Sequence, residues 1–181
     1  MAVLIESAVF PRDLEAVHAL FSGYSSSLRI DLTFQSFQDE LDFLPGKYSE
    51  SQGGVILIAR GGVGHADHNL ALHSGPTSNP TVRIFPAVGC VALRRSPDNW
   101  CEMKRLYVLE DARGLKLGDK LVEAIVAQAK AFSYRGIRLD TLPDMTVAQR
   151  LYRRHGFVEI EPYYDTPIEG TIFMGCEFTR S

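Results

Sequence analysis

The fold is decided by residues 102–118, which read EMKRLYVLEDARGLKLG. The first part has the composition of a strand, and residues 110–112 make a short turn. The segment RGLKLG, from Arg113 to Gly118, then opens a helix, because apolar residues recur at three- and four-residue spacing from Leu117 to Phe132. This stretch therefore predicts a strand, a tight turn and a long helix in direct succession.

The helix start in this stretch is suited to phosphate groups. Small residues let the backbone approach a ligand, and the free N–H groups of a helix start carry about +0.5 elementary charge. Arg113 and Lys116 add two cations there. A Walker loop is excluded because Gly118 is followed by Asp119 and Lys120, and Gly-x-Gly-x-x-Gly is absent. A diphosphate cradle is the favoured interpretation, and a plain strand–helix turn with a packing glycine is the alternative.

The strand before the turn changes its apolar parity. Cys101 and Met103 are apolar on one parity, whereas Leu106 and Val108 are apolar on the other. A strand of period two cannot place both pairs on one face without an extra residue, so the pattern predicts a β-bulge near residues 104–105. The alternative is a central strand that is covered on both faces.

The remaining chain alternates strands and helices and shows no domain boundary. Strands are expected over residues 3–10, 54–59, 85–93, 100–109, 137–142, 157–160 and 171–178. Helices are expected from Asp13, over the stripe from Phe34 to Leu44 that ends at Pro45, from Leu117 to a terminating Gly136, and from Pro143 to Gly156. Residues 61–84 form a long excursion between two hairpin strands. We expect a single domain over residues 1–181 of the α/β (mixed α+β) class.

Composition and charge exclude several function classes. Apolar residues make up 45% of the 181 residues, which is ordinary for a folded globular protein, and the net charge of −3 argues against non-specific binding to nucleic acid or anionic membrane. Cys90, Cys101 and Cys176 are odd in number and lie in apolar stretches, which favours a reducing cytoplasm over a disulfide framework. We found no apolar run long enough to span a membrane.

Three segments together resemble the GNAT superfamily of acetyl-CoA-dependent N-acetyltransferases. They are residues 101–108, residues 113–118 and residues 151–157, which read LYRRHGF. The resemblance covers roughly residues 85–178. It implies a twisted, mixed and mostly antiparallel sheet with helices on both faces. It also implies that the sheet splays between the bulged strand and residues 137–142, where the coenzyme arm inserts.

The resemblance implies roles for particular residues in binding acetyl-CoA. The pyrophosphate loop corresponds to residues 113–118 with Asp119 next to it, and the strand that pairs with the pantetheine arm corresponds to residues 106–108. The coenzyme-binding residues are then Leu106, Tyr107, Val108, Arg113, Gly114, Leu115, Lys116, Leu117, Gly118, Asp119 and Tyr152. Two positions depart from the family pattern: Lys116 stands where a glycine is usual, and Met145 stands where an asparagine is often found.

The expected reaction is direct acetyl transfer to an amine in a ternary complex, with no metal ion. An alkyl amine is an ammonium at pH 7 and must lose a proton before it attacks. Glu102 is the candidate base, directly or through water, and the alternative is a surface carboxylate paired with Lys104 or Arg105. Tyr152 is the candidate acid near the leaving sulfur, and the alternative is a core tyrosine with a satisfied hydroxyl. The Val108 backbone N–H is the expected oxyanion donor.

The acceptor is expected to be a small-molecule amine. By family analogy, its pocket would use the amino-terminal helices and the loop before the last strand. The candidate wall residues are Tyr24, Asp31, Phe34, Tyr163 and Tyr164. The loop histidines His65, His68 and His73 have no cysteine or carboxylate cluster that would indicate a metal site. Two alternatives stay open: a catalytically silent CoA-binding sensor, and a protein or peptide lysine acetyltransferase. The chain is expected to be a monomer or a homodimer.

Overall fold

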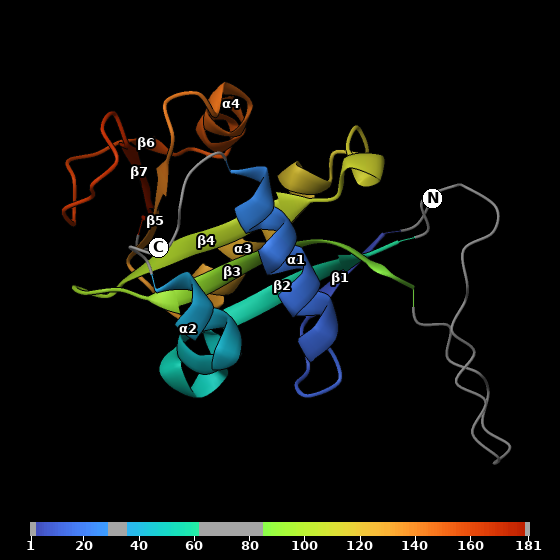
Figure 1. Cartoon of the computed structure of the whole chain (residues 1–181). Helices are drawn as coiled ribbons and strands as arrows, with labels where there is room; N and C mark the ends of the chain where they lie inside the picture. The colour runs from blue at the N-terminus through green and yellow to red at the C-terminus, as the bar shows by residue number, and fades with distance from the viewer. Residues whose placement is uncertain (1–2, 29–35, 62–84, 180–181) are drawn as a thin grey trace, which may run out of the picture.

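The computed structural model describes residues 3–28, 36–61 and 85–179, which form a seven-stranded sheet with helices on both faces (Figure 1). The strand order is β1-β2-β3-β4-β5-β7-β6. The strands are β1 (Leu4–Ser7), β2 (Val55–Arg60), β3 (Ala87–Arg95), β4 (Trp100–Val108), β5 (Gly136–Thr141), β6 (Val158–Glu159) and β7 (Ile172–Glu177). The helices are α1 (Leu14–Ser27), α2 (Phe37–Asp42), α3 (Leu117–Ala131) and α4 (Thr146–Arg154), with 3₁₀ turns η2 (Gly46–Tyr48), η3 (Glu50–Gln52) and η4 (Glu110–Ala112).

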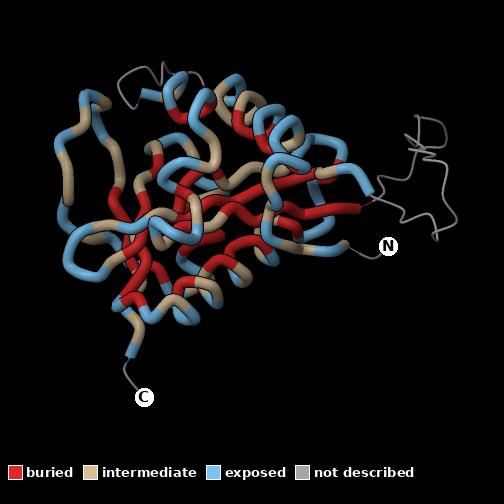
Figure 2. Tube along the Cα trace, turned by 90° about the horizontal axis from the view of Figure 1, so that it is seen from below, coloured by how far each residue is buried: buried red, intermediate tan, exposed pale blue. Residues whose placement is uncertain are grey.

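The sheet carries one apolar core on each face, because side chains alternate along every strand. Ile56 and Ile58 of β2 belong to the core that includes Phe21 of α1, whereas Leu57 belongs to the core that includes Leu121 of α3. Figure 2 shows the buried residues along the central strands and on the inner sides of the helices. The expected arrangement, with helices on both faces of a mixed sheet, is confirmed.

The sheet opens between β4 and β5. These two strands run parallel, whereas all other neighbouring strands in the sheet pair antiparallel. Their pairing covers only the positions from Trp100 opposite Gly136 to Glu102 opposite Arg138, although β4 continues to Val108. The predicted splay is therefore confirmed, and it begins beyond Glu102.

The predicted bulge in β4 is also confirmed. Tyr107 pairs with Cys90 and Lys104 pairs with Ala92, so two residues of β4 stand opposite one residue of β3. Arg105, within this bulge, has a left-handed backbone with φ 57°. The bulge explains the change of apolar parity: Met103 before it and Leu106 and Val108 after it all pack against the same core, the one that includes Leu121 of α3.

Most predicted elements appear near their expected positions, and several boundaries are wrong: β1, for example, ends at Ser7 rather than at Phe10. Helix α3 ends at Ala131, and Gly136 is the first residue of β5 rather than a helix terminator. A side chain at Gly136 would place its Cβ 2.5 Å from the ring of Trp100, which is the packing reason for glycine there. Helix α2 ends at Asp42, so Leu44 follows it, and Phe34 lies outside the described residues.

The hairpin around the long excursion is confirmed through its two strands. β2 and β3 pair antiparallel, and residues 62–84 between them lie outside the described residues. The three cysteines are free. Across residues 3–28, 36–61 and 85–179, no helix combines the length and the apolar character needed to cross a membrane.

Candidate active site

A cavity of about 40 Å³ lies where β4 and β5 separate. Its walls come from both faces of the sheet, because Tyr24 of α1 and Tyr152 of α4 both line it. The loop between β6 and β7 lines it with Thr166, Ile168 and Thr171. The space holds only a few water-sized groups, so the geometry suits a small reacting group rather than a bulky one.

The backbone of β4 presents polar groups to this opening. The N–H of Leu109 donates to the carbonyl of Val88 at 2.9 Å. Since hydrogen-bonded and non-bonded pairs alternate in an antiparallel ladder, the neighbouring pair of Val108 and Gly89 is non-bonded, and the Val108 peptide groups face away from β3. The Val108 carbonyl accepts instead from Arg113 Nε at 3.4 Å. Its N–H therefore points towards the side on which β5 has diverged.

The adjacent predicted residues of β4 have different surroundings. Leu106 lines the cavity, whereas Tyr107 packs on helix α1. A Cβ added at Gly23 of α1 would lie 2.9 Å from the Tyr107 ring, so the glycine allows this close approach. Leu106 thus faces the opening, the Val108 side chain packs against the core that includes Leu121, and Tyr107 contributes through the backbone and packing.

The turn between β4 and α3 has the geometry of an anion cradle. Gly114 has φ 84° with no atom within 4 Å of an added Cβ, and Lys116 has φ 56° directly before the first helical residue. The first-turn amides of a helix have no intrahelical acceptor, so the amides of Leu117 and Gly118 can bind an anion. Arg113 and Leu115 are exposed beside them.

Asp119, in the first turn of α3, is held by the end of α4. Its Oδ1 accepts from Arg154 Nη2 at 2.8 Å and lies 3.3 Å from His155 Nε2. The hydrogen bond from Arg154 lowers the pKa of Asp119, despite partial desolvation that works in the opposite direction. This contact joins the two helices at the edge of the cradle, where a Cβ added at Gly118 would lie 3.2 Å from Leu151 Cδ2.

Tyr152 lies at the cavity from the α4 side. It is 6% exposed, and its ring packs against Phe157 with a centroid distance of 5.9 Å. Burial raises its pKa well above the ordinary value, and the neighbouring Tyr24 and Asp140 raise it further. Its hydroxyl makes no hydrogen bond within the part of the chain that the structure describes, in contrast to the alternative of a satisfied core tyrosine. The hydroxyl is therefore a protonated donor at neutral pH.

Glu102 is placed differently from a surface carboxylate. It is 3% exposed, and its Oε2 accepts from Arg94 Nε at 2.6 Å. Its Oε1 accepts from the hydroxyl of Tyr163 at 3.0 Å and lies 3.6 Å from Lys104 Nζ. Glu102 does not line the cavity. Its carboxylate is thus set back from the cavity and is bound by Tyr163, a residue of the loop between β6 and β7.

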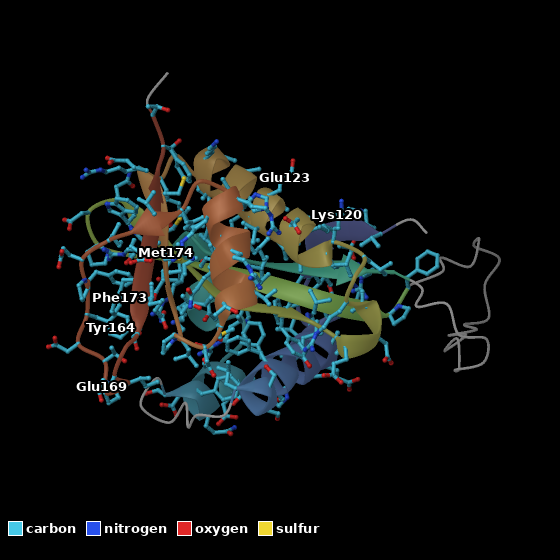
Figure 3. The ribbon with its side chains drawn as sticks, turned by 90° about the horizontal axis from the view of Figure 1, so that it is seen from above. Lys120, Glu123, Tyr164, Glu169, Phe173 and Met174 are labelled. Atoms are coloured by element: carbon cyan, nitrogen blue, oxygen red, sulfur yellow. The ribbon has the colours of Figure 1, made fainter. Side chains whose placement is uncertain are left out.

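The predicted acceptor residues are only partly brought together. Tyr24 lines the cavity, and Tyr163 and Tyr164 form a cluster of edge-to-face rings with Phe173 of β7, with interplanar angles of 61°, 77° and 79°. Figure 3 shows Tyr164 and Phe173 beside each other, with Glu169 further along the loop. The guanidinium of Arg138 stacks on Tyr163 at 4.0 Å. Asp31 and Phe34 lie outside the described residues.

Sequence reasoning missed three charged residues of the cavity wall, Lys104, Arg105 and Asp140. Lys104 Nζ lies 2.7 Å from Asp140 Oδ1, and both side chains line the cavity between β4 and β5. The sequence did contain a feature that could have identified Asp140, because it is the only acidic residue in the predicted buried strand Ile137–Leu142. A charge inside such a strand is stable only with a partner, which is a reason to place it at a site.

The fold and the site define a class of protein: an acyltransferase with an anion cradle at a helix start and a bulged strand beside a splayed sheet. A sequence profile described as an acetyltransferase (GNAT) domain matches residues 81–159. An N-acetyltransferase of Schizosaccharomyces pombe, named as uncharacterized, is 36% identical over 178 residues, which cover 98% of this chain and 96% of that protein. The chain belongs to the GNAT superfamily of N-acetyltransferases.

Solved structures show the same fold. An acetyltransferase of the GNAT family from Staphylococcus aureus has a TM-score of 0.71 at 21% identity, and the match covers 97% of this chain and 99% of that one. PaiA N-acetyltransferase from Thermoplasma acidophilum, in complex with coenzyme A, has a TM-score of 0.66 at 15% identity, with 98% and 100% covered. Within residues 3–28, 36–61 and 85–179, no cluster of three His, Cys, Asp or Glu residues could hold a metal ion.

Proposed function

We propose that this protein transfers the acetyl group of acetyl-CoA to the primary amine of a small molecule, by direct attack in a ternary complex. The observation that carries the proposal is the cavity at the splay, lined by Tyr152 on one side of the sheet and Tyr24 on the other. The small volume of this cavity, about 40 Å³ with Thr166 of the loop in its wall, favours a small acceptor over a protein lysine, which would need an open groove.

The residues of the cradle fit the coenzyme. Gly114 leaves open space where a side chain would stand, so phosphate oxygens can approach the backbone from Arg113 to Gly118. Leu106 and Val108 present β4 to the pantetheine arm, because β5 has diverged there. When bound, acetyl-CoA supplies the thioester that is cleaved. Tyr107, Leu115, Lys116, Leu117 and Asp119 complete the proposed binding residues.

The chemistry divides among three groups. The Val108 N–H, held by the strand, donates to the oxygen on which negative charge develops during attack. Tyr152 donates its proton towards the departing sulfur, because burial and the carboxylate of Asp140 keep its hydroxyl protonated. Glu102 is the proposed base, and it acts through the Tyr163 hydroxyl or a water, since that hydroxyl already occupies its Oε1.

A CoA-binding sensor without catalysis is the second candidate, and two observations favour it. Lys116 adopts the left-handed conformation that a family glycine would adopt without strain, and Met145 lines the cavity where an asparagine is often found. Both changes lie in the coenzyme site, so they could preserve binding while altering turnover.

The test is release of free thiol from acetyl-CoA with the full chain and a panel of amines. The panel contains amino acids, polyamines, aryl-alkyl amines, aminoglycosides and peptides, and calorimetry with CoA is run beside it. Thiol release with a small amine supports the proposal, and release with peptides alone favours the lysine acetyltransferase. Tight CoA binding without turnover on any amine favours the sensor. No affinity for CoA would refute both coenzyme-based functions.

A further inference from the structure

A row of alternating charges crosses the sheet from β3 to β5 and ends at the cavity. We call it the charge row, and its members are Arg94, Glu102, Lys104 and Asp140. Arg94 Nη2 lies 2.5 Å from Glu102 Oε2, and Lys104 Nζ lies 3.6 Å from Glu102 Oε1 and 2.7 Å from Asp140 Oδ1. The row thus places one carboxylate in its interior and one at its open end.

The two carboxylates of the charge row are not equivalent. Glu102 has two cationic partners, and its side chain is 4% exposed. Among the described residues, Asp140 has only Lys104 within ion-pair distance and shares it with Glu102, and its side chain is 16% exposed. Asp140 is also the only acidic side chain among the described residues that line the cavity. Its charge is therefore the less balanced of the two, and it faces the site.

The other polar groups around Asp140 do not neutralise it. Burial raises the pKa of Tyr24, of Tyr152 and of Tyr164, and the charge of Asp140 acts in the same direction on each, so these hydroxyls stay protonated. Burial works to raise the pKa of Asp140 itself, but the charge of Lys104 and hydrogen bonds from Lys104 and Tyr164 outweigh it. Arg105, the second cation of the cavity wall, is paired with Glu40 at 2.7 Å. Asp140 is thus an anion at neutral pH, and its ion-pair partner among the described residues is the shared cation Lys104.

We propose that Asp140 is a specificity-determining residue that receives the ammonium group of the acceptor, so that the substrate class is alkyl amines rather than aryl amines. The inference rests on the proposed acetyltransferase function. An alkyl amine arrives as a cation at pH 7, and it supplies the second positive charge that the open end of the charge row lacks. An aryl amine is neutral at pH 7 and gains nothing from the carboxylate.

The experiment compares two isomeric probes on Asp140→Asn, Asp140→Glu and Asp144→Asn. 2-Phenylethylamine is a cation at pH 7, and 4-ethylaniline is its neutral isomer; spermidine serves as a second cationic probe. Asp144 is exposed and does not line the cavity, so its variant makes the same chemical change outside the site. Thiol release gives KM and kcat for each amine, and calorimetry gives the affinity for CoA.

The expected result is a KM for the cationic probes that rises at least ~10-fold in Asp140→Asn, with a change in the KM for acetyl-CoA of less than ~2-fold. Asp140→Glu should keep the preference for the cationic isomer, and Asp144→Asn should behave as wild type. If the Asp140–Lys104 salt bridge had a purely structural role, its loss in Asp140→Asn would lower stability without raising the KM for the cationic probes relative to the KM for acetyl-CoA. The inference is overturned if Asp140→Asn keeps the wild-type KM for the cationic probes, or if the wild type uses both isomers equally. Either result leaves the proposed acetyltransferase function unaffected. If no amine is acetylated or bound, both fail.

Discussion

The two ends of the proposed site are built in opposite ways. The cradle end is a contiguous piece of chain, residues 113–119, that acts through backbone amides, and its side chains Arg113 and Leu115 are exposed. The acceptor end is assembled from α1, β3, β4, β5, α4 and the loop after β6, and it acts through buried charged and tyrosine side chains. The first end is a local motif, whereas the second exists only once the sheet has formed.

The two ends also differ in how their charged residues contribute to the stability of the fold. At the cradle end, charges such as the Arg113–Glu110 pair stay in water and contribute little to stability. Around the acceptor end, charges are buried, and each depends on its partner because an unpaired buried charge is costly. The Arg105–Glu40 pair is the clearest case: the two side chains are 1% and 2% exposed, and Arg105 Nε lies 2.7 Å from Glu40 Oε1. Changes at the acceptor end should therefore disturb folding as well as function.

The largest expected effect comes from breaking that buried pair. Glu40→Ala leaves the Arg105 guanidinium without this carboxylate and should lower the free energy of unfolding by about 3 kcal/mol. Glu110→Ala, which removes the exposed partner of Arg113, should lower it by only about 0.3 kcal/mol. Urea unfolding of both variants measures the difference. Similar losses in the two variants would contradict the contrast between the ends.

Acid should destabilise the protein through the same carboxylates. Burial works to raise the pKa of Glu40, but Arg105 and Lys47 outweigh it, and the net shift is downward, as for Asp140. A carboxylate with a lowered native pKa stabilises the fold above its unfolded pKa, and that stability is lost as the pH falls through the native pKa. The free energy of unfolding should therefore decline below about pH 4, by up to about 1.4 kcal/mol per pH unit for each proton taken up.

The control for the acid effect is Glu40→Gln, which removes one of the titrating carboxylates. Its free energy of unfolding should be lower at pH 7 and should change less between pH 5 and pH 3 than that of the wild type. Thermal or urea unfolding across this range measures both slopes. Equal slopes would remove Glu40 from the acid response.

Tyr152→Phe should reduce kcat about 10-fold, which corresponds to about 1.4 kcal/mol of transition-state stabilisation, with little change in the KM for acetyl-CoA. The reason is that the hydroxyl acts on the sulfur as it departs in the transition state, rather than on acetyl-CoA in the ground state. Tyr134→Phe is the matched control, because it removes another core hydroxyl, which donates to the Gly53 carbonyl at 2.6 Å away from the cavity. Tyr134→Phe should lower the free energy of unfolding and leave kcat unchanged. Unchanged turnover in Tyr152→Phe would remove Tyr152 from the proposed acid role.

The comparison also explains what the sequence could predict. The bulge in β4 was predictable because the parity change at Leu106 is local, and the turn that opens α3 was predictable because Arg113 to Gly118 is contiguous. The partner of Glu102 was not predictable in this way, because Arg94 lies on the neighbouring strand and the prediction considered only sequence neighbours. Asp140 was missed because its contact with Lys104 depends on how β5 aligns beside β4, which no local pattern specifies.

The smallest predicted effect separates conformation from charge at the cradle. Lys116 has φ 56°, a left-handed backbone that costs a non-glycine residue roughly 1–2 kcal/mol, whereas a glycine adds roughly 0.5–1 kcal/mol of unfolded-state entropy. Lys116→Gly should therefore stabilise the protein by about 0.5 kcal/mol, and Lys116→Ala, which keeps the strain, should not. Both variants remove the same ammonium group, so they should change the affinity for CoA by the same factor in calorimetry. A difference between them in CoA affinity would show that the conformation of the turn, rather than the charge, governs the cradle.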